Sequence, residues 1–200
     1  MIIHPSYFID IESLVYLYHS DRVVIELHDS YLKQTYRNRC CILAANGKLN
    51  LTIPILRDSK QSSLYKDILI DNRQDWKLNH LKSIKSAYQS SPYFEFYEDD
   101  LLRLYQVSTT GLLDWNIQTL RWIMDQLNLS KSLSFTTDFY NDELAAHLIK
   151  AKREHTQKLS RYIQVFQEKH GYVSGLCSLD LLFNLGPASS AYLNQQQLGS

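Results

Sequence analysis

The sequence has few of the glycine and cysteine residues from which common cofactor and metal sites are built. Its six glycines form neither G-x-G-x-x-G nor a P-loop, so glycine-cradled dinucleotide or ATP binding has no support. Three cysteines, of which Cys40 and Cys41 are adjacent, match neither a disulfide framework nor a zinc pattern. G-x-S-x-G and H-E-x-x-H are also missing. We therefore expect no metal, no resident cofactor and a reducing compartment.

The chain also lacks an excess of charge of either sign and any long apolar run. Lys plus Arg and Asp plus Glu both number 21, which gives a net charge of zero. This removes the electrostatic basis for nonspecific binding to nucleic acid, so an anion site would have to be local. No segment approaches the roughly 20 apolar residues needed to span a bilayer, and the first residues do not form a signal peptide. We expect a cytoplasmic protein with no nucleic-acid partner and no membrane insertion.

The length and composition are those of one folded domain. Two hundred residues and 23.4 kDa suffice for a real core, and 44 % hydrophobic with 21 % charged residues is ordinary for a globular protein. We predict a single domain over residues 1–194. Residues 195–200 (QQQLGS) have little to pack and are expected to form a disordered tail.

The N-terminal segment predicts a βαβ unit. Met1–Ile3 is a short apolar run, Ile11–His19 has apolar residues at helical spacing, and Arg22–Leu27 is rich in β-branched residues. Strand, helix and strand in this order predict a parallel pair joined right-handedly. Because parallel strands end at the same edge of a sheet, we expect His4–Tyr7 and His28–Asp29 to be neighbours there, where open α/β sheets bind ligands.

A β-hairpin is predicted around Asn46-Gly47. This pair is a strong turn signal because a type I′ turn needs two residues that tolerate a positive φ. Pairing centred on this turn places Leu49, Leu51, Ile53 and Ile55 opposite Ala44, Ile42, Cys40 and Asn38. Since side chains alternate across a strand, one face is apolar up to Asn38 at its rim. Arg37 and Arg39 lie on the other face.

The remaining residues predict one more strand after the hairpin and then mainly helices. The strand is expected at Tyr65–Ile70, and a weak one at Leu133–Phe135. The predicted helices are Gln74–Gln89, Tyr93–Tyr105, Leu112–Leu127, Asp138–Lys158, Tyr162–Glu168 and Ser178–Leu185. The expected fold class is therefore α/β, with an N-terminal mixed sheet, which contains the βαβ unit and the hairpin, and a helical C-terminal half.

The densest polar cluster comprises Lys33, Arg37, Asn38 and Arg39. Arginine offers a planar fork of donors that suits phosphate or carboxylate, and asparagine can fix an orientation. The alternative is that these cations are strand-end charges paired with nearby acids such as Glu26 or Asp29.

Two histidines and one acid–amide pair are further candidates, each with a structural alternative. His4 at the predicted strand end suits a general base, or it caps a carbonyl in the turn shaped by Pro5. His80 follows Trp76 by one helical turn and is either a core histidine or a group at a site edge. Asp180 and Asn184 lie at i and i+4 on an apolar helix, so both need buried partners or face the arginine cluster.

A series of short blocks spans almost the whole chain in a recognisable order. They are His4-Pro5-Ser6-Tyr7-Phe8, Tyr31-Leu32-Lys33, Arg37-Asn38-Arg39, Leu51-Thr52-Ile53-Pro54, Trp76…His80…Ser83-Ile84, Ser91-Pro92-Tyr93-Phe94, Tyr162…Gln164 and Leu179-Asp180-Leu181-Leu182-Phe183-Asn184 before Gly186-Pro187. In these blocks the chain resembles the WbqC-like proteins, which occur in bacterial gene clusters for O-antigen and related surface polysaccharides. It departs from the family pattern at Ile9 and Arg161, where proline is expected, and in a shortened stretch before Tyr162.

The resemblance implies a transferase of lipopolysaccharide-type biosynthesis that moves an acyl or aminoacyl group to an amino sugar or sugar nucleotide, with an acyl donor as co-substrate. A noncatalytic, sugar-nucleotide-binding accessory protein of the same pathway is the alternative. An enzyme would bury His4 or His80 beside an acid and keep a path to solvent. The candidate catalytic residues are His4, His80 and Asp180, and the candidate substrate-binding residues are Tyr7, Lys33, Arg37, Asn38, Arg39 and Asn184.

Overall fold

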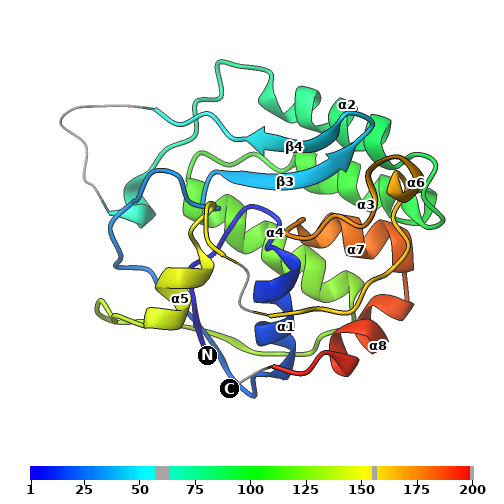
Figure 1. Ribbon diagram of the computed structural model, residues 1–200. Helices are drawn as coiled ribbons and strands as arrows, with labels where there is room; N and C mark the ends of the chain where they lie inside the picture. The colour runs from blue at the N-terminus through cyan, green and yellow to red at the C-terminus, as the bar shows by residue number, and fades with distance from the viewer. Residues whose placement is uncertain (57–63, 155–156, 199–200) are drawn as a thin grey trace.

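The computed structural model describes residues 1–56, 64–154 and 157–198, and its N-terminal part is the expected βαβ unit (Figure 1). Strands β1 (Ile2–Ile3) and β2 (Val23–Ile25) are parallel, and helix α1 (Ile11–His19) connects them. The weak strand is also present as β5 (Leu133–Phe135), which pairs with β2 in parallel. The sheet order β1-β2-β5 therefore brings three carboxyl ends to one edge.

Strands β3 (Arg39–Ala44) and β4 (Gly47–Thr52) form the predicted hairpin as a second, separate sheet. The predicted register is wrong by two residues, because Leu51 lies opposite Cys40 rather than Ile42. Gly47 has a φ of +102° and already belongs to β4, whereas Asn46 is not among the described non-glycine residues with a positive φ. A turn followed by a left-handed glycine therefore replaces the type I′ turn. A shift of two keeps each side chain on its predicted face.

Most predicted helices are present with boundaries within two residues. They are α2 (Trp76–Tyr88), α3 (Phe94–Gln106), α4 (Leu112–Gln126) and α7 (Ser178–Leu185). The strand expected at Tyr65–Ile70 is wrong. That segment instead begins with a short 3-10 helix, η1 (Tyr65–Asp67), because the hydroxyl of buried Tyr65 donates to the Pro5 carbonyl at 2.8 Å and fixes the chain locally.

The long helix expected at Asp138–Lys158 is also wrong, since within the described residues of that segment, 138–154 and 157–158, only α5 (Glu143–Leu148) forms. Beyond α5 the chain turns back, and Lys150 forms an isolated antiparallel bridge with Thr35. The Tyr36 amide donates to the Ile149 carbonyl at 2.8 Å, and the Ala151 amide donates to the Gln34 carbonyl at 3.1 Å. Tertiary pairing therefore overrides helix propensity in this charged segment. Of the helix predicted at Tyr162–Glu168, the structure has α6 (Gln167–His170).

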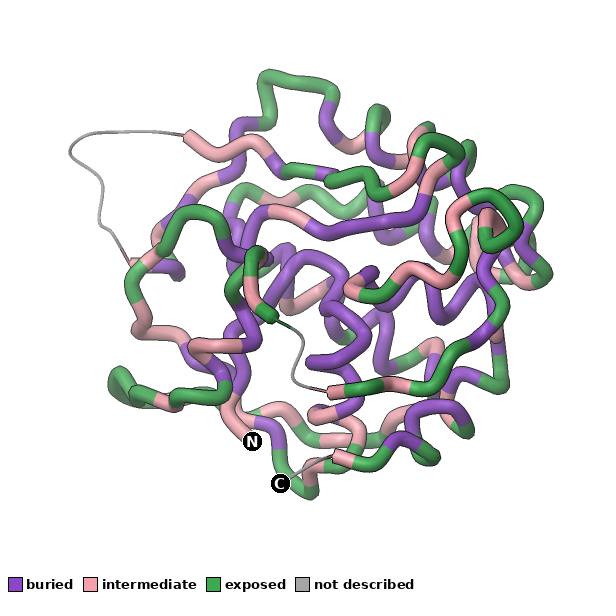
Figure 2. The backbone as a smooth tube through the Cα atoms, viewed as in Figure 1, coloured by how far each residue is buried: buried purple, intermediate pink, exposed green. Residues whose placement is uncertain are grey.

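The core lies between the hairpin and helices α1, α4 and α7, as Figure 1 shows. Figure 2 shows β3 buried along most of its length, whereas its partner β4 is largely exposed. Helix α7 is buried from Ser178 to Asn184, so its polar side chains must find partners inside the protein. The α/β class, with a βαβ unit, a hairpin and a helical C-terminal half, is confirmed.

The C-terminal residues pack further than the sequence suggests. Helix α8 spans Ala188–Gln195, so Gln195, where the disordered tail was expected to begin, is the last helical residue. Gln196 is buried, and its Oε1 accepts a hydrogen bond from the Ser160 amide at 2.8 Å. No helix within residues 1–56, 64–154 and 157–198 is long and apolar enough to cross a membrane.

Candidate functional site

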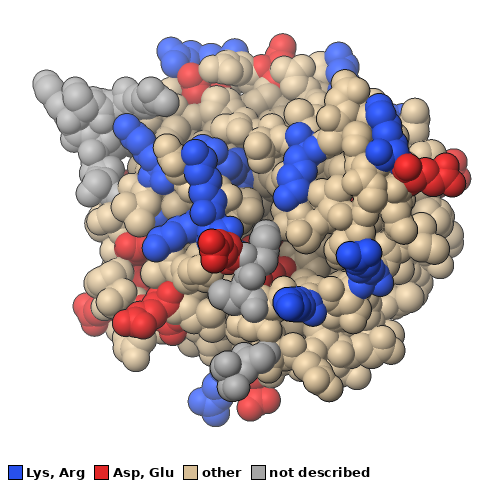
Figure 3. All heavy atoms as spheres, viewed as in Figure 1, with Lys and Arg blue, Asp and Glu red and all other residues tan. Residues whose placement is uncertain are grey.

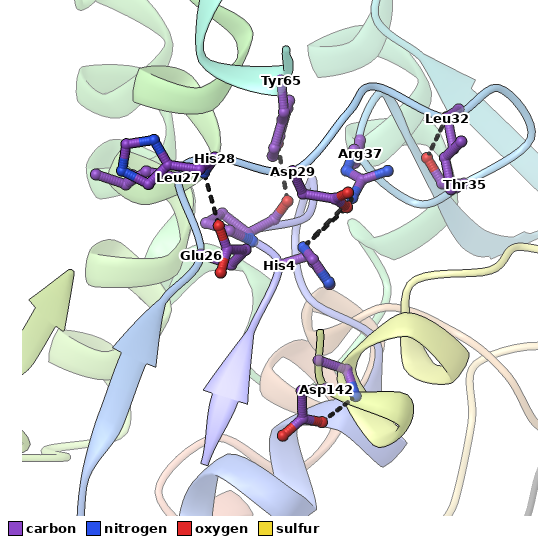
Figure 4. A network of polar contacts seen from close by, with 12 residues as sticks. His4, Glu26, Leu27, His28, Asp29, Leu32, Thr35, Arg37, Tyr65 and Asp142 are labelled. Carbon is purple, nitrogen blue, oxygen red and sulfur yellow. Dashed lines mark hydrogen bonds and ion pairs between the residues drawn. The ribbon is translucent and has the colours of Figure 1, made fainter. Parts of the chain in front are cut away.

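The candidate site lies at the carboxyl edge of the parallel sheet, where polar residues follow each strand directly (Figure 4). His4 follows β1, Glu26 follows β2 and Thr136 follows β5. The Thr136 amide continues the sheet by donating to the Ile25 carbonyl at 3.0 Å, and its hydroxyl donates to Glu26 Oε1 at 3.3 Å. Three segments that are distant in sequence therefore meet at one edge.

His4, Asp29 and Arg37 form the centre of this edge. His4 Nδ1 lies 3.4 Å from Asp29 Oδ2 and 3.3 Å from Arg37 Nη2. The same Arg37 nitrogen donates a hydrogen bond to Asp29 Oδ2, as Figure 4 shows. The side chains of His4 and Arg37 are 4 % and 0 % exposed, whereas that of Asp29 is 17 % exposed. The expected proximity of His4 and Asp29 is thus observed, and Asp29 connects the two buried groups with solvent.

His4 is neutral at physiological pH. Burial and the positive charge of Arg37 lower the pKa of His4 to about 4, and this outweighs the opposite effect of Asp29. Two neutral tautomers fit the contacts. With its proton on Nδ1, the ring donates to Asp29 and keeps Nε2 as a free base, whereas with the proton on Nε2 it accepts from Arg37. Only the first form leaves a basic ring nitrogen that is not already paired with Arg37, as a general base requires.

Arg37 is held in place by its main chain and by its neighbours. Its carbonyl accepts a hydrogen bond from Asn116 Nδ2 at 2.6 Å, and its guanidinium lies 5.0 Å from the centre of the Tyr65 ring. Asn116 also donates to the Tyr65 hydroxyl, which in turn donates to the Pro5 carbonyl. Arg37 Nε and Nη1 have no hydrogen-bond partner among the described residues. Unpaired buried donors are costly, so these two atoms mark a place suited to an acceptor.

Glu26 organises the loops around the edge. It is fully buried, and it accepts hydrogen bonds from the His28 amide at 2.7 Å and the Tyr140 amide at 3.0 Å. These contacts fix the loop after β2 against the loop after β5. Neither Glu26 nor Asn116 was a predicted site residue. The available signal was the general requirement that a polar residue on a buried face has a partner.

The other cations of the predicted polar cluster lie further out. Lys33 is exposed and Arg39 is half-buried at the start of β3. Asn38 has a structural contact, because its Nδ2 donates to the Ile53 carbonyl at 3.1 Å and closes the base of the hairpin. Figure 3 shows Lys and Arg side chains gathered on this face, near the base of the hairpin. Exposed Lys150 contributes here, since the backbone at Lys150 pairs with Thr35.

His80 and Tyr7 belong to a separate aromatic cluster. The Tyr7 hydroxyl is 2.9 Å from His80 Nδ1 and also hydrogen-bonds to the Tyr105 hydroxyl. Burial lowers the pKa of His80 to about 4, although a hydrogen bond to the Thr52 backbone acts in the opposite direction. His80 therefore lies among aromatic residues, as expected of a core histidine. Its ring has no acid beside it in the described structure.

Asp180 lies in a third network. Its Oδ1 accepts from the Tyr88 hydroxyl at 2.9 Å, and its Oδ2 accepts from the Tyr162 hydroxyl at 2.6 Å and Gln164 Nε2 at 3.1 Å. Burial raises the pKa of Asp180, although these donors act against the shift. Asn184 Nδ2 donates to the Asp180 carbonyl at 2.7 Å. The pair thus faces tyrosines and an amide rather than the arginine cluster.

The nine predicted site residues therefore divide into groups. His4 and Arg37 are in contact at the sheet edge, whereas Lys33 is exposed and Arg39 is half-buried at the start of β3. Tyr7 pairs with His80, Asp180 pairs with Asn184, and Asn38 holds the hairpin. Within the described ranges, no group of three or more His, Cys, Asp or Glu is arranged to hold a metal ion.

Comparison with known families gives one match. The model of the WbqC-like protein family matches residues 6–164 of the 200-residue chain. The chain belongs to the WbqC-like protein family. The family match includes Arg37 and His80, whereas His4 lies before it and Asp180 lies after it. Neither a curated protein nor a solved structure matches this WbqC-like chain.

Proposed function

We propose that this WbqC-like protein is a cytoplasmic transferase of bacterial surface-polysaccharide biosynthesis that moves an acyl or aminoacyl group to an amino sugar or sugar nucleotide. The observation that carries the proposal is the contact of His4 with Asp29 and Arg37 at the carboxyl edge of the parallel sheet. One imidazole is buried beside an acid, and that acid reaches solvent. This is the arrangement expected of an enzyme rather than of a passive binding module.

His4 is the proposed general base. In the Nδ1–H tautomer its free Nε2 takes a proton from the attacking amine of the acceptor, and Asp29 stabilises the imidazolium that forms. The amine nitrogen forms a bond to the acyl carbon, and the bond from that carbon to the leaving group of an activated donor breaks. His4 then returns its proton to the leaving group, so the base is regenerated.

The cations have two roles in this proposal. Arg37 is the buried anchor that sets the position of Asp29, and its unpaired Nε and Nη1 suit an acceptor oxygen. Lys33 is exposed and Arg39 is half-buried at the start of β3, and these two cations would attract a diphosphate. Tyr7 and His80 act through packing, since they lie in the aromatic cluster that continues from the segment following His4.

A noncatalytic binding protein of the same pathway is the second candidate, and one observation favours it. The cavity beside His4, which Ala145 and Leu148 also line, has a volume of only 20 Å³. That is room for about one water molecule. An acceptor could then contact the exposed cations without reaching the imidazole.

The two candidates differ in what His4 and Lys33 contribute. Thermal unfolding would be followed with nucleoside-diphosphate amino sugars and acyl-CoA thioesters, and turnover would be followed by mass spectrometry. A ligand at 100 times its Kd should stabilise by about 2.7 kcal/mol. We expect Lys33→Ala to weaken binding and His4→Gln to abolish transfer while binding remains. Exposed Lys82→Ala on α2 is the matched charge control.

Each outcome has a clear meaning. Stabilisation without turnover in the wild-type protein would support the accessory protein and refute the transferase. No stabilisation by any of these ligands would refute both candidates. Turnover that survives His4→Gln unchanged would remove His4 from the mechanism.

A further inference from the structure

A large groove is lined by residues of α6, α7 and α8 and of the segment around Tyr162, and none of its lining residues lines the cavity beside His4. Its volume is 1170 Å³, slightly above the range of about 300–1,000 Å³ that is usual for ligand sites. One wall is the segment that contains Tyr162 and Gln164, and the opposite wall is α8 with Ala188 and Ala191. It has no lining residue in common with the cluster of His4, Asp29 and Arg37.

Asn184 places a fixed hydrogen-bond acceptor in this groove. Asn184 as a whole residue is 7 % exposed and lines the groove, and its Nδ2 donates to the Asp180 carbonyl at 2.7 Å. A backbone carbonyl only accepts, so the atom that faces it must be the amide nitrogen. The oxygen, Oδ1, therefore points away from that carbonyl. It has no partner within residues 1–56, 64–154 and 157–198, and it is not among the fully buried unpartnered atoms, so it is open to solvent in the groove, where a ligand can reach it.

The wall of the groove beside Asn184 is rigid. Tyr162 and Gln164 both line the groove and both donate to the buried carboxylate of Asp180. The Gln164 amide also makes two hydrogen bonds to the backbone of Val173, each 2.9 Å long. A binding surface fixed in this way loses little entropy when a ligand binds.

The lining favours an uncharged ligand that carries hydroxyl groups. Arg161 and Glu168 contribute one charge of each sign, so the groove has no net charge. The other polar groups are mainly side-chain amides, including those of Gln167 and Gln195. An amide offers a donor and an acceptor side by side, which suits neighbouring hydroxyls. Ile163, which is 79 % exposed, and the alanines of α8 supply apolar contacts.

We propose that the groove between the segment around Tyr162 and helices α7 and α8 is a binding site for a neutral saccharide, with Asn184 Oδ1 accepting a hydrogen bond from a sugar hydroxyl. The apolar C–H face of a sugar ring packs on Ala188 and Ala191. The site is separate from the His4 edge, and it holds a saccharide whether or not transfer takes place there.

The test uses the full chain and nuclear magnetic resonance. The probes are the methyl glycosides of glucose, galactose and N-acetylglucosamine, up to roughly 50 mM, which would saturate even a site with a Kd of about 1 mM. Glucuronate and inorganic phosphate are the charged comparators. The readout is the side-chain amide signal of Asn184 together with the backbone signals of α8.

Two exposed positions on α8 provide a matched pair of variants. Ala191→Trp fills the groove, whereas Asn194→Trp adds the same side chain to the same helix outside the groove lining. At least one glycoside should shift the Asn184 signal, Ala191→Trp should raise its Kd at least about tenfold, and Asn194→Trp should not. The proposal is overturned if no glycoside shifts these signals, if Ala191→Trp leaves binding intact, or if the charged probes bind there more tightly.

Discussion

Arg37 is completely buried, and it donates a hydrogen bond to Asp29, which keeps 17 % of its side chain exposed. The main chain of Arg37 is fixed inside the protein, because the Arg37 carbonyl accepts a hydrogen bond from Asn116. The acid is therefore positioned from within and presented at the rim of the sheet edge. Because the cation is inside and the acid is at the rim, loss of either partner should lower the free energy of unfolding.

Replacing Asp29 alone should destabilise the protein more than replacing both partners. Asp29→Asn leaves the completely buried Arg37 without its anion, and an unpaired buried charge should cost about 3 kcal/mol. The double variant Arg37→Met with Asp29→Asn removes the unpaired charge and should recover part of that loss. Urea unfolding of the wild type, both single variants and the double variant measures this coupling. Strictly additive effects would show that the ion pair does not stabilise the fold.

Stability should fall as the pH is lowered from about 6.5 to about 4, in part because of His80. Burial lowers the pKa of His80 to about 4 in the folded protein, whereas the unfolded chain has the ordinary value of about 6.5. Between these values the unfolded chain binds more protons, so acid favours unfolding. The difference corresponds to about 3 kcal/mol for a full shift.

The variant His80→Phe isolates this contribution. It removes the titrating ring while the Tyr7 hydroxyl keeps its hydrogen bond to Tyr105. The free energy of unfolding, measured by urea at a series of pH values, should then depend less steeply on pH between 4 and 6.5. Equal slopes for the variant and the wild type would contradict the buried, neutral state of His80.

Tyr162 should stabilise the fold through its single hydroxyl. That hydroxyl donates to buried Asp180 at 2.6 Å, so Tyr162→Phe leaves a carboxylate oxygen with one donor fewer. Loss of a hydrogen bond to a charged group should cost about 1.5–3 kcal/mol. Tyr140→Phe is the matched control, because the Tyr140 side chain is exposed and the residue is 59 % accessible. Equal effects of the two substitutions would argue against an ionised Asp180 that depends on its tyrosines.

Two glycines with positive φ should respond differently to alanine. At Gly47 (φ +102°) a Cβ would meet nothing within 4 Å, so Gly47→Ala should cost about 1 kcal/mol from backbone strain alone. At Gly186 (φ +52°) a Cβ would lie 2.4 Å from the Tyr93 ring, so Gly186→Ala must also displace that ring. Thermal unfolding of both variants should show the larger loss for Gly186→Ala. The reverse order would refute the close packing of Tyr93 on the end of α7.

Local sequence signals explain why several elements could be predicted. Asp10 precedes the apolar stripe of α1 and caps it through the Ser13 amide, and Gly186 ends α7 with a left-handed φ. The signals failed where a distant segment decided the conformation. Residues 149–151 pair with residues 34–36, and the buried side chain of Arg153 binds Asp10 and Glu12. Neither contact can be predicted from the local periodicity of residues 138–158.

The candidate site shows the same division. The proximity of His4 and Asp29 followed from strand order alone, because two parallel strands must end at one edge. The separation of His80 from that edge did not follow, since helical spacing places a side chain on a face without saying what covers it. The position of Asp180 on an apolar helix likewise predicted that it needs partners. It did not predict that these would be Tyr88, Tyr162 and Gln164.

The family, the α/β class and the βαβ unit whose edge carries His4 could be predicted from the residues alone, because periodicity, capping residues and short ordered blocks are properties of neighbouring residues. The packing of the folded chain, in contrast, sets which cation meets which acid, which histidine is enclosed and where the groove beside Asn184 lies. Such contacts join residues far apart in the chain, and their partners are selected by the packing of whole elements rather than by any local pattern.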